Sequence, residues 1–234
     1  MRVYLIRHAQ STNNVLQDVR DRVVDPDLTP LGYEQAETLA SWLARATELK
    51  GEPFGFTRLL VSPMWRALLT AQPLARAYSL PMHVEIDLHE VGGMFLEDRD
   101  TGIITGYGGL TRSTMLERFD NLHLPDSVTE QGWWNPQMGM ESYAHGIMRA
   151  VRTAHRIVQM AQDHPHERLA LVTHGAFMDL LVKAFLHQLP TPETTLFYAH
   201  YNTAITRLDL REGDGLRVHY LNRVDHLPLD KRSW

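Results

Sequence analysis

Apolar residues in the first part of the chain alternate between short continuous runs and stretches with helical spacing. Arg2 to Ile6 forms the first run and predicts a buried strand. A helix is expected after it, with Thr29 as the N-cap and Pro30 as the first helical residue. Apolar side chains then recur at steps of three and four residues, which gives this helix one buried stripe: Ala36, Leu39, Ala40, Leu43 and Ala46.

The same design recurs in the next stretch of the chain. Leu59 to Val61 predicts a second strand, and Ser62 and Pro63 are expected to cap and open the helix that follows it. Pro73 lies inside the helical pattern, so this helix should bend or end near it. A short strand is expected from Met82 to Ile86.

The last third of the chain adds two helices, one strand and a hairpin. Tyr143 to Gln162 has helical spacing, Leu169 to Val172 reads as a strand, and Phe177 to Leu186 reads as a helix. Residues 204–222 alternate apolar and polar side chains around a Gly-Asp-Gly turn, which predicts a hairpin or an edge pair of strands. Strands that alternate with helices indicate a layered α/β fold.

The segment from Gly92 to Met140 differs because glycines, prolines, acids and aromatics mix there without a steady period. Its one clear helix start has Thr111 as the cap. We interpret the chain as a single domain, residues 1–234, with an insertion at about 92–140 that forms a lid over the functional face. Such a lid would select the substrate. Trp133 and Trp134 are expected to anchor a loop in it.

Composition narrows the classes of function. A formal charge of −5 over 234 residues gives no basic field of the kind that nucleic acid binding uses, so no nucleic acid partner is expected. The chain contains no cysteine, which excludes disulfides, thiolate metal sites and cysteine nucleophiles. There are 13 histidines, but no pair has the spacing of a metal motif, and we expect neither a metal nor a cofactor. No segment is predicted to span a membrane, and a cytoplasmic location is expected.

Candidate chemistry gathers at three junctions between a strand and a helix. Arg7 and His8 end the first strand, Arg66 follows the second, and His174 follows the strand that ends at Val172. The carboxyl ends of parallel strands lie at one edge of a sheet, so these four side chains should converge there. Two guanidinium groups and helix N–H groups are typical of a site for phosphate.

A neutral imidazole facing a phosphate group is a competent nucleophile toward phosphorus. The leaving oxygen then needs a proton from a nearby acid. Glu90, which follows the short strand, is the candidate, and burial beside a phosphate dianion would keep its carboxyl protonated near neutral pH.

Several motifs carry a resemblance to the histidine phosphatase superfamily, also called phosphoglycerate mutase-like. The stretch RHAQSTNN at residues 7–14 resembles the opening motif Arg-His-Gly-Glu/Gln-Ser/Thr-x-x-Asn. The other matching stretches follow in the family's order: LTPLGYEQA at 28–36, SPMWRALLTA at 62–71, VTHGAF at 172–177, NTAITRLDL at 202–210 and LNRVDHL at 221–227. The resemblance implies a three-layer sandwich, with a mostly parallel central sheet and helices on both faces.

The resemblance also implies roles. His8 would be the nucleophile that forms a phosphohistidine, while Arg7, Arg66 and His174 would hold the phosphoryl group. Glu90 would be the general acid and then the base that activates water. No metal is required in this chemistry.

Gln10 and Asn14 would be secondary contacts to phosphate or substrate, whereas Thr29, Gly32 and Gln35 are expected to be structural. Two features depart from the family pattern. Ala9 replaces the usual glycine, and the stretch after Glu90 lacks the Arg-His-Tyr-Gly of the glycolytic mutases.

Three functions follow as alternatives. The first is a phosphomonoester hydrolase that acts through phosphohistidine on a small phosphorylated metabolite. The second is a phosphoglycerate mutase, which the missing Arg-His-Tyr-Gly disfavours, and the third is a phospho-ligand binding protein without catalysis. The late hairpin could pair with another subunit to form a homodimer.

Overall fold

A computed structural model describes residues 1–48, 51–188, 196–211, 213 and 215–234. Within these residues the centre of the molecule is a seven-stranded sheet with the order β6-β3-β2-β7-β1-β8-β9. Its strands are β1 (Arg2–Arg7), β2 (Arg58–Val61), β3 (Met82–Val84), β6 (Leu122–His123), β7 (Arg168–Thr173), β8 (Ile205–Arg211) and β9 (Gly215–Arg223).

Strand direction divides this sheet into two parts. The strands from β6 to β1 run parallel to one another, and Arg7 at the end of β1 pairs with Thr173 at the end of β7. β8 runs antiparallel to β1, and β9 runs antiparallel to β8. The sheet is therefore mostly parallel, as predicted, and the carboxyl ends of its parallel strands meet at one edge.

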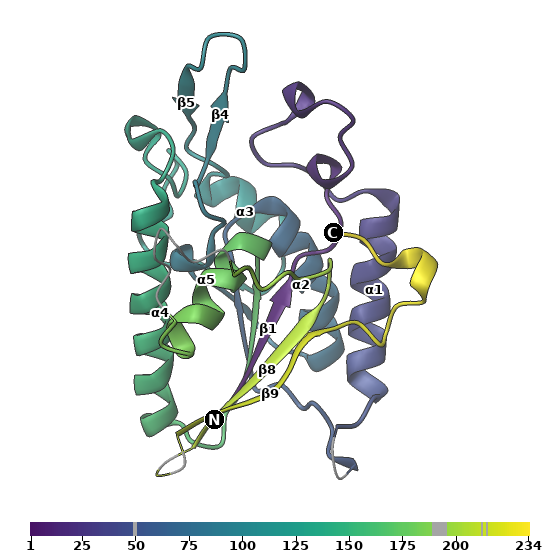
Figure 1. Ribbon diagram of the computed structural model, residues 1–234. Coiled ribbons are helices and arrows are strands. Elements are labelled where there is room, and N and C mark those ends of the chain that lie inside the picture. The colour runs from purple at the N-terminus through teal and green to yellow at the C-terminus, as the bar shows by residue number, and fades with distance from the viewer. Residues whose placement is uncertain (49–50, 189–195, 212, 214) are drawn as a thin grey trace.

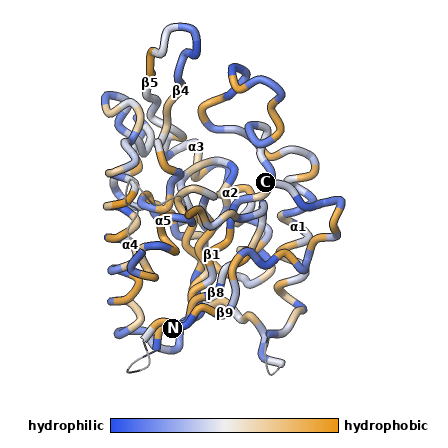
Figure 2. Tube along the Cα trace, viewed as in Figure 1, coloured by the Kyte–Doolittle hydropathy of each residue, from blue (hydrophilic) through white to orange (hydrophobic). Residues whose placement is uncertain are grey.

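Helices cover both faces of the sheet (Figure 1). Tyr4 and Ile6 of β1 pack in one core with α1 (Pro30–Arg45) and α2 (Trp65–Tyr78). Val3 and Leu5 point the other way, into a second core with α4 (Tyr143–Asp163) and α5 (Gly175–Phe185). Figure 2 shows the hydrophobic residues concentrated along the central strands between the helices. The predicted three-layer α/β fold is confirmed.

The two predicted helix caps have different outcomes. Thr29 caps α1, and its Oγ1 accepts a hydrogen bond from the Gly32 N–H at 3.0 Å. Ser62 does not cap α2, because the helix begins at Trp65 and Met64 is its N-cap residue. The expectation that Ser62 and Pro63 open this helix is wrong. The helix also continues past Pro73 to Tyr78, so it does not end at the proline.

Other element boundaries differ by a few residues. The helix expected from Phe177 begins earlier, at Gly175, and the strand from Met82 ends at Val84 before a short 3₁₀ helix at Ile86–Leu88. The predicted hairpin is present as β8 and β9, with β9 at the edge of the sheet. Asp214 of its turn lies outside the described residues.

Residues 92–140 contain the hairpin of β4 (Phe95–Glu97) and β5 (Ile104–Gly106), the helix α3 (Arg112–Arg118) and β6. The hairpin and the early loop at 12–27 both rise beyond the carboxyl edge of the sheet (Figure 1). Thr111 caps α3 as expected, since its Oγ1 accepts the Thr114 N–H. Trp133 and Trp134 are buried, and the Trp134 indole donates to the Gly139 carbonyl at 3.1 Å, which anchors the segment.

In the described part of the chain, every helix is too short or too polar to cross a bilayer.

Candidate active site

The carboxyl edge of the sheet brings His8, Arg66 and His174 together. The His8 and His174 ring centroids lie 5.1 Å apart, and Arg66 Nε lies 3.2 Å from His8 Nε2. His8 follows β1, His174 follows β7, and Arg66 sits in the first turn of α2. The predicted convergence is therefore present, because three junctions between strand and helix end at one place.

The hydrogen bonds of His8 fix which nitrogen carries its proton. Nδ1 lies 2.7 Å from the Ala9 carbonyl oxygen, which can only accept, so we assign the proton to Nδ1. Nε2 then has a lone pair and accepts a hydrogen bond from Arg66 Nε. Burial, followed by the charges of Arg66 and Arg7, lowers the pKa of His8 well below its ordinary value. The ring is thus neutral at pH 7.

Arg66 is held by an acid that the sequence pattern did not reveal. Its Nη1 lies 3.7 Å from Asp25 Oδ1, and the Asp25 carboxylate also accepts the Trp65 N–H at 3.0 Å. Asp25 thereby takes the place of the missing cap at the start of α2. Burial raises the pKa of Asp25 to about 6, although Arg66 acts to lower it. Asp25 lies in a polar loop, and nothing in its local pattern connects it with Arg66.

Ser62 sets the orientation of His174. Ser62 Oγ lies 2.7 Å from His174 Nε2 and accepts the Met64 N–H at 3.3 Å. We assign the imidazole proton to Nδ1, so that the Ser62 hydroxyl donates its own proton to Nε2. Among the described residues, this buried Nδ1 has no hydrogen-bond partner. Burial, and then the charge of Arg66, lowers the pKa of His174 well below its ordinary value.

Arg7 also has an unpaired donor beside the site. Its Nη1 donates to the His200 carbonyl at 2.5 Å, while its buried Nε lacks a partner within the described part of the chain. A Cβ on Gly175 would lie 3.2 Å from this Nε, so the absence of a side chain there lets the guanidinium approach α5. Burial lowers the pKa of Arg7 to about 10, with Glu90 opposing this and Arg66 adding to it.

Glu90 lies over the N-terminus of α5, next to Arg7. Its Oε1 accepts the N–H groups of Val91 and Phe177, both at 2.9 Å, and its Oε2 accepts the Ala176 N–H at 3.2 Å. The first turn of a helix favours negative charge, so its amides hold this carboxyl in place. The fifth predicted residue therefore belongs to the same site.

Gln10 and Asn14 make hydrogen bonds within the protein through their amide oxygens, and their contact with phosphate or substrate stays a prediction. Gln10 Oε1 accepts the Thr29 hydroxyl at 2.6 Å, and Gln10 N donates to Gln35 Oε1 at 2.9 Å. Asn14 is exposed, and its Oδ1 accepts both the N–H and the hydroxyl of Ser11 at 2.9 Å. Both side chains brace the loop after His8. Thr29 and Gln35 are structural, as predicted.

Ala9 fits its buried position without backbone strain. It is fully buried, its N–H donates to Thr70 Oγ1 at 2.9 Å, and its φ lies outside the left-handed region. The position does not require the glycine that the family pattern has there.

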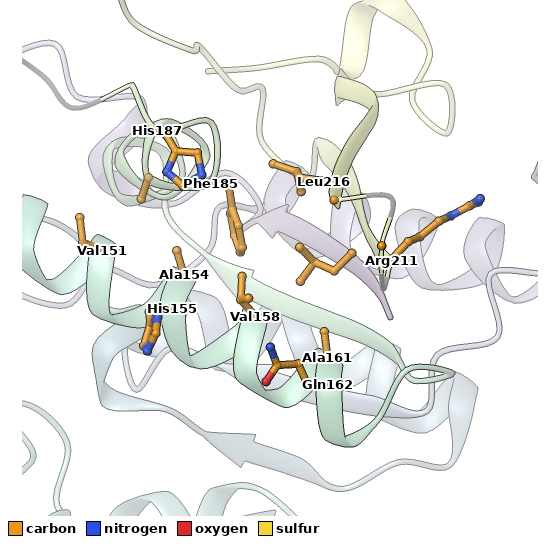
Figure 3. Close-up of a pocket in the computed structure, with 14 residues that line it drawn as sticks. Val151, Ala154, His155, Val158, Ala161, Gln162, Phe185, His187, Arg211 and Leu216 are labelled. Carbon is orange, nitrogen blue, oxygen red and sulfur yellow. The ribbon is translucent and has the colours of Figure 1, made fainter.

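A cavity of about 730 Å³ lies away from this site. Figure 3 shows Val151, Ala154 and Val158 of α4 directed toward Phe185 of α5 and Leu216 of β9. None of the candidate site residues His8, Arg7, Arg66, Glu90 and His174 lines this cavity. Among the described residues, no cluster of three or more histidines and acids is arranged to hold a metal ion.

Comparison with known families identifies the class of protein. The family model described as "Histidine phosphatase superfamily (branch 1)" matches residues 3–223. The chain therefore belongs to this superfamily.

Related sequences include phosphatases and mutases. A probable phosphatase of Schizosaccharomyces pombe is 23% identical over 232 residues, which is 98% of this chain and 72% of the relative. A probable phosphoglycerate mutase, GpmB, of Yersinia pestis is 24% identical over 219 residues, covering 92% of this chain and 88% of the relative. The chain is accordingly an enzyme of the phosphatase and phosphoglycerate mutase-like type.

Solved structures share the fold. A phosphoserine phosphatase of Entamoeba histolytica in complex with 3-phosphoglyceric acid matches with a TM-score of 0.62 and 21% identity, over 97% of this chain and 99% of that one. A mycobacterial glucosyl-3-phosphoglycerate phosphatase with bound VO₃ matches with a TM-score of 0.59 and 20% identity, over 95% and 99% of the two chains. At these identities the likeness establishes the fold alone.

Proposed function

We propose that this enzyme hydrolyses phosphomonoesters of small metabolites through a phosphohistidine at His8. The observation that carries the proposal is the environment of His8 Nε2. Its lone pair faces Arg66 Nε at 3.2 Å, while Nδ1 is bonded to the Ala9 carbonyl. Neutral imidazole next to a cationic donor can attack an electrophile whose negative charge that donor also binds.

In the first step, His8 Nε2 attacks phosphorus and the bond from phosphorus to the ester oxygen breaks. A proton that the Glu90 carboxyl takes up as the phosphomonoester binds beside it passes to that oxygen, so the alcohol leaves neutral. Arg66 Nε would transfer its hydrogen bond from His8 to a phosphoryl oxygen. The unpaired donors Arg7 Nε and His174 Nδ1 supply further hydrogen bonds to the same oxygens.

In the second step, the Glu90 carboxylate accepts a proton from water as the water oxygen attacks phosphorus. The bond between phosphorus and His8 Nε2 breaks, and inorganic phosphate leaves. Glu90 ends protonated and His8 ends neutral, which are their states at the start of the first step. The amides of Ala176 and Phe177 stabilise the carboxylate that exists between the two steps.

Replacing His8 tests this proposal. His8→Ala should abolish phosphate release from p-nitrophenyl phosphate, because no other described group offers a lone pair at that position. An inactive variant gives no inhibition constant, so the binding of inorganic phosphate is measured by calorimetry. Its dissociation constant should stay within about tenfold of the wild-type value. His155→Ala is the matched control: His155 lies on α4 and lines the remote cavity. Unchanged turnover in His8→Ala would refute the nucleophile, and a wild type that binds phosphate without any turnover would favour a binding protein.

The mutase alternative has support in the name of the Yersinia relative. A mutase returns the phosphoryl group to a second hydroxyl instead of to water. Phosphate release and isomerisation of 3-phosphoglycerate are therefore measured with and without bisphosphoglycerate. Hydrolysis should exceed isomerisation under both conditions, and the reverse order would replace the hydrolase by a mutase.

We further propose that residues 92–140 form the lid that selects the substrate. This is supported by the position of the β4–β5 hairpin beyond the carboxyl edge of the sheet (Figure 1) and by two exposed apolar side chains below its polar tip, Ile103 at 62% and Ile104 at 42% exposure. A panel of phosphomonoesters, run on wild type and Ile103→Asp, tests this. The order of preference should change in the variant, and an unchanged order would remove the role. A homodimer through β9 and a cytoplasmic location stay predictions.

A further inference from the structure

Hydrogen bonds from a residue of α4 hold the short segment that carries Glu90. Arg149 of α4 is 2% exposed, and its Nη1 donates to the carbonyls of Asp87 at 2.7 Å and His89 at 2.8 Å. These carbonyls belong to the residue three positions before Glu90 and to the residue directly before it. One guanidinium nitrogen therefore fixes the path of the backbone directly before the proposed acid.

Glu141 completes this grip. Arg149 donates Nε to Glu141 Oε1 at 2.9 Å and Nη2 to Oε2 at 2.6 Å, a bidentate pair in which both side chains are buried. The Gly92 N–H points to Glu141 Oε2 at 3.4 Å, and the Glu141 N–H donates to the Gly92 carbonyl at 2.8 Å. The backbone is thus held after Glu90 as well as before it.

The electrostatics of the pair agree with this geometry. Burial acts to raise the pKa of Glu141, but His89 and Arg149 outweigh it and bring the value to about 2. Glu141 is therefore ionised throughout the working range of pH. A buried ion pair is costly to place, and replacing one with apolar side chains is often neutral or stabilising. A role in positioning the backbone around Glu90 would explain why the ion pair is present.

We propose that Arg149 and Glu141 are positioning residues for Glu90. The inference rests on the proposed function, in which Glu90 protonates the leaving oxygen. The α5 amides hold the carboxyl group, whereas the ion pair holds the backbone on both sides of it. Loosening the backbone would let the carboxyl drift from the leaving oxygen without altering His8 or the arginines.

The pair also connects Glu90 with the lid. His89 packs against Trp133 and Trp134, with ring centroids 5.4 Å and 5.1 Å away, and its Nε2 lies 3.7 Å from Glu141 Oε2. Glu141 itself directly follows the lid segment. A shift of the two indoles would therefore reach the residue next to the proposed acid.

The test uses the dependence of rate on the leaving group. A general acid matters most when the leaving alcohol is a poor leaving group, and it matters little for p-nitrophenolate. The variants are Glu141→Gln, which keeps the shape of the side chain but removes its charge, and Arg149→Lys, which keeps the charge but loses the bidentate guanidinium group. The readout is the ratio of kcat/KM for p-nitrophenyl phosphate to kcat/KM for glycerol phosphate, because kcat/KM reports the phosphorylation step.

This ratio should rise at least about tenfold in both variants, in the same direction as in Glu90→Gln, while inhibition by inorganic phosphate changes less than about threefold. Arg156→Gln is the matched control on α4, since Arg156 pairs with Glu85 at the surface at 3.2 Å. It should leave the ratio unchanged. Thermal unfolding and circular dichroism verify that each variant is folded.

The outcomes separate the two proposals. In one outcome Glu90→Gln raises the ratio, whereas the folded Arg149 and Glu141 variants lose kcat/KM equally for both substrates. The ion pair then has only a structural role, so the positioning inference fails and the proposed function stands. If Glu90→Gln itself leaves the ratio unchanged, Glu90 is not the acid and the proposed mechanism fails with it.

Discussion

His174 Nε2 lies 2.7 Å from Ser62 Oγ, although the two residues are 112 positions apart in the chain. The serine lies at the end of β2 and the histidine at the end of β7, and these two strands are neighbours in the sheet. With the Ser62 hydroxyl assigned as the donor to Nε2, the imidazole proton is on Nδ1, which has no partner among the described residues. A residue expected to cap a helix is instead the hydrogen-bond partner that sets which nitrogen of His174 can donate.

Ser62→Ala should therefore weaken phosphate recognition. The change leaves a buried ring nitrogen unpaired and frees the tautomer, at a cost of about 1–3 kcal/mol. We expect kcat/KM for p-nitrophenyl phosphate to fall roughly tenfold or more, with weaker inhibition by inorganic phosphate. Ser142→Ala is the control, because Ser142 caps α4 through the His145 N–H at 3.3 Å. Equal activity of the two variants would contradict the role of Ser62.

Gly175→Ala should displace Arg7. The added Cβ would lie 3.2 Å from Arg7 Nε, which is tighter than an ordinary van der Waals contact. The guanidinium must retreat by a few tenths of an ångström, and we expect inhibition by inorganic phosphate to weaken roughly three- to tenfold. Thermal unfolding should change little, since alanine is a better helix former than glycine. Unchanged inhibition would show that Arg7 Nε does not face the phosphoryl group.

Asp25→Asn should lower activity through Arg66. The amide oxygen can still accept the Trp65 N–H, but it offers no charge to Arg66 Nη1, which now lies 3.7 Å from the carboxylate. We expect kcat/KM to fall by about ten- to a hundredfold at pH 7.5, as for other small misplacements of a binding group. Asp27→Asn is the control, because Asp27 is exposed and pairs with the Tyr33 hydroxyl. A variant as active as the control would exclude Asp25 from the site.

The stability of the same variant should depend on pH in a defined direction. Burial raises the pKa of Asp25 from 3.8 to about 6, so the folded protein holds this proton more tightly than the unfolded chain. The contribution of Asp25 to stability is thus fully present below pH 3.8 and falls as the pH rises through 6. Asn carries no such penalty. The unfolding temperature of Asp25→Asn relative to wild type should therefore rise between pH 4 and pH 7, and a fall would contradict the assignment.

Ala9→Gly restores the residue usual in the family and should bring no gain in activity. Because Ala9 has an ordinary φ and a buried methyl group, glycine adds chain entropy to the unfolded state and removes packing. We expect the free energy of unfolding to fall by about 1 kcal/mol, measured by urea denaturation, with kcat/KM within about twofold of wild type. A large rise in activity would mean that the methyl group obstructs the phosphate.

The layered fold could be predicted because its signals are local. The strand at the N-terminus is a continuous apolar run, and the Thr29-Pro30 start of α1 follows from a side chain that caps its own helix. The start of α2 could not be predicted in the same way. The Trp65 N–H at its start donates to Asp25, which lies 40 residues earlier in the chain. The sequence next to the helix offers only Ser62 and Pro63 as candidates.

The candidate site also contains residues that the sequence could predict and residues that it could not. The arginines and histidines could be predicted because parallel strands must end at a common edge, which needs topology but no exact packing. Asp25, Arg149 and Glu141 could not, since each acts across elements and lies in an ordinary polar or helical stretch. Motif position does not reveal that the amide oxygens of Gln10 and Asn14 accept hydrogen bonds from Thr29 and Ser11.

The central claim is that His8 Nε2 carries the phosphoryl group during turnover. The most direct measurement is a rapid mix of enzyme with p-nitrophenyl phosphate, quenched in alkali and analysed by mass spectrometry of the peptide that contains His8. Phosphate should be found on His8, and it should build up to a higher level in Glu90→Gln, in which water is activated slowly. A phosphate found on another residue, or a burst of p-nitrophenol with no phosphate on His8, would contradict the account.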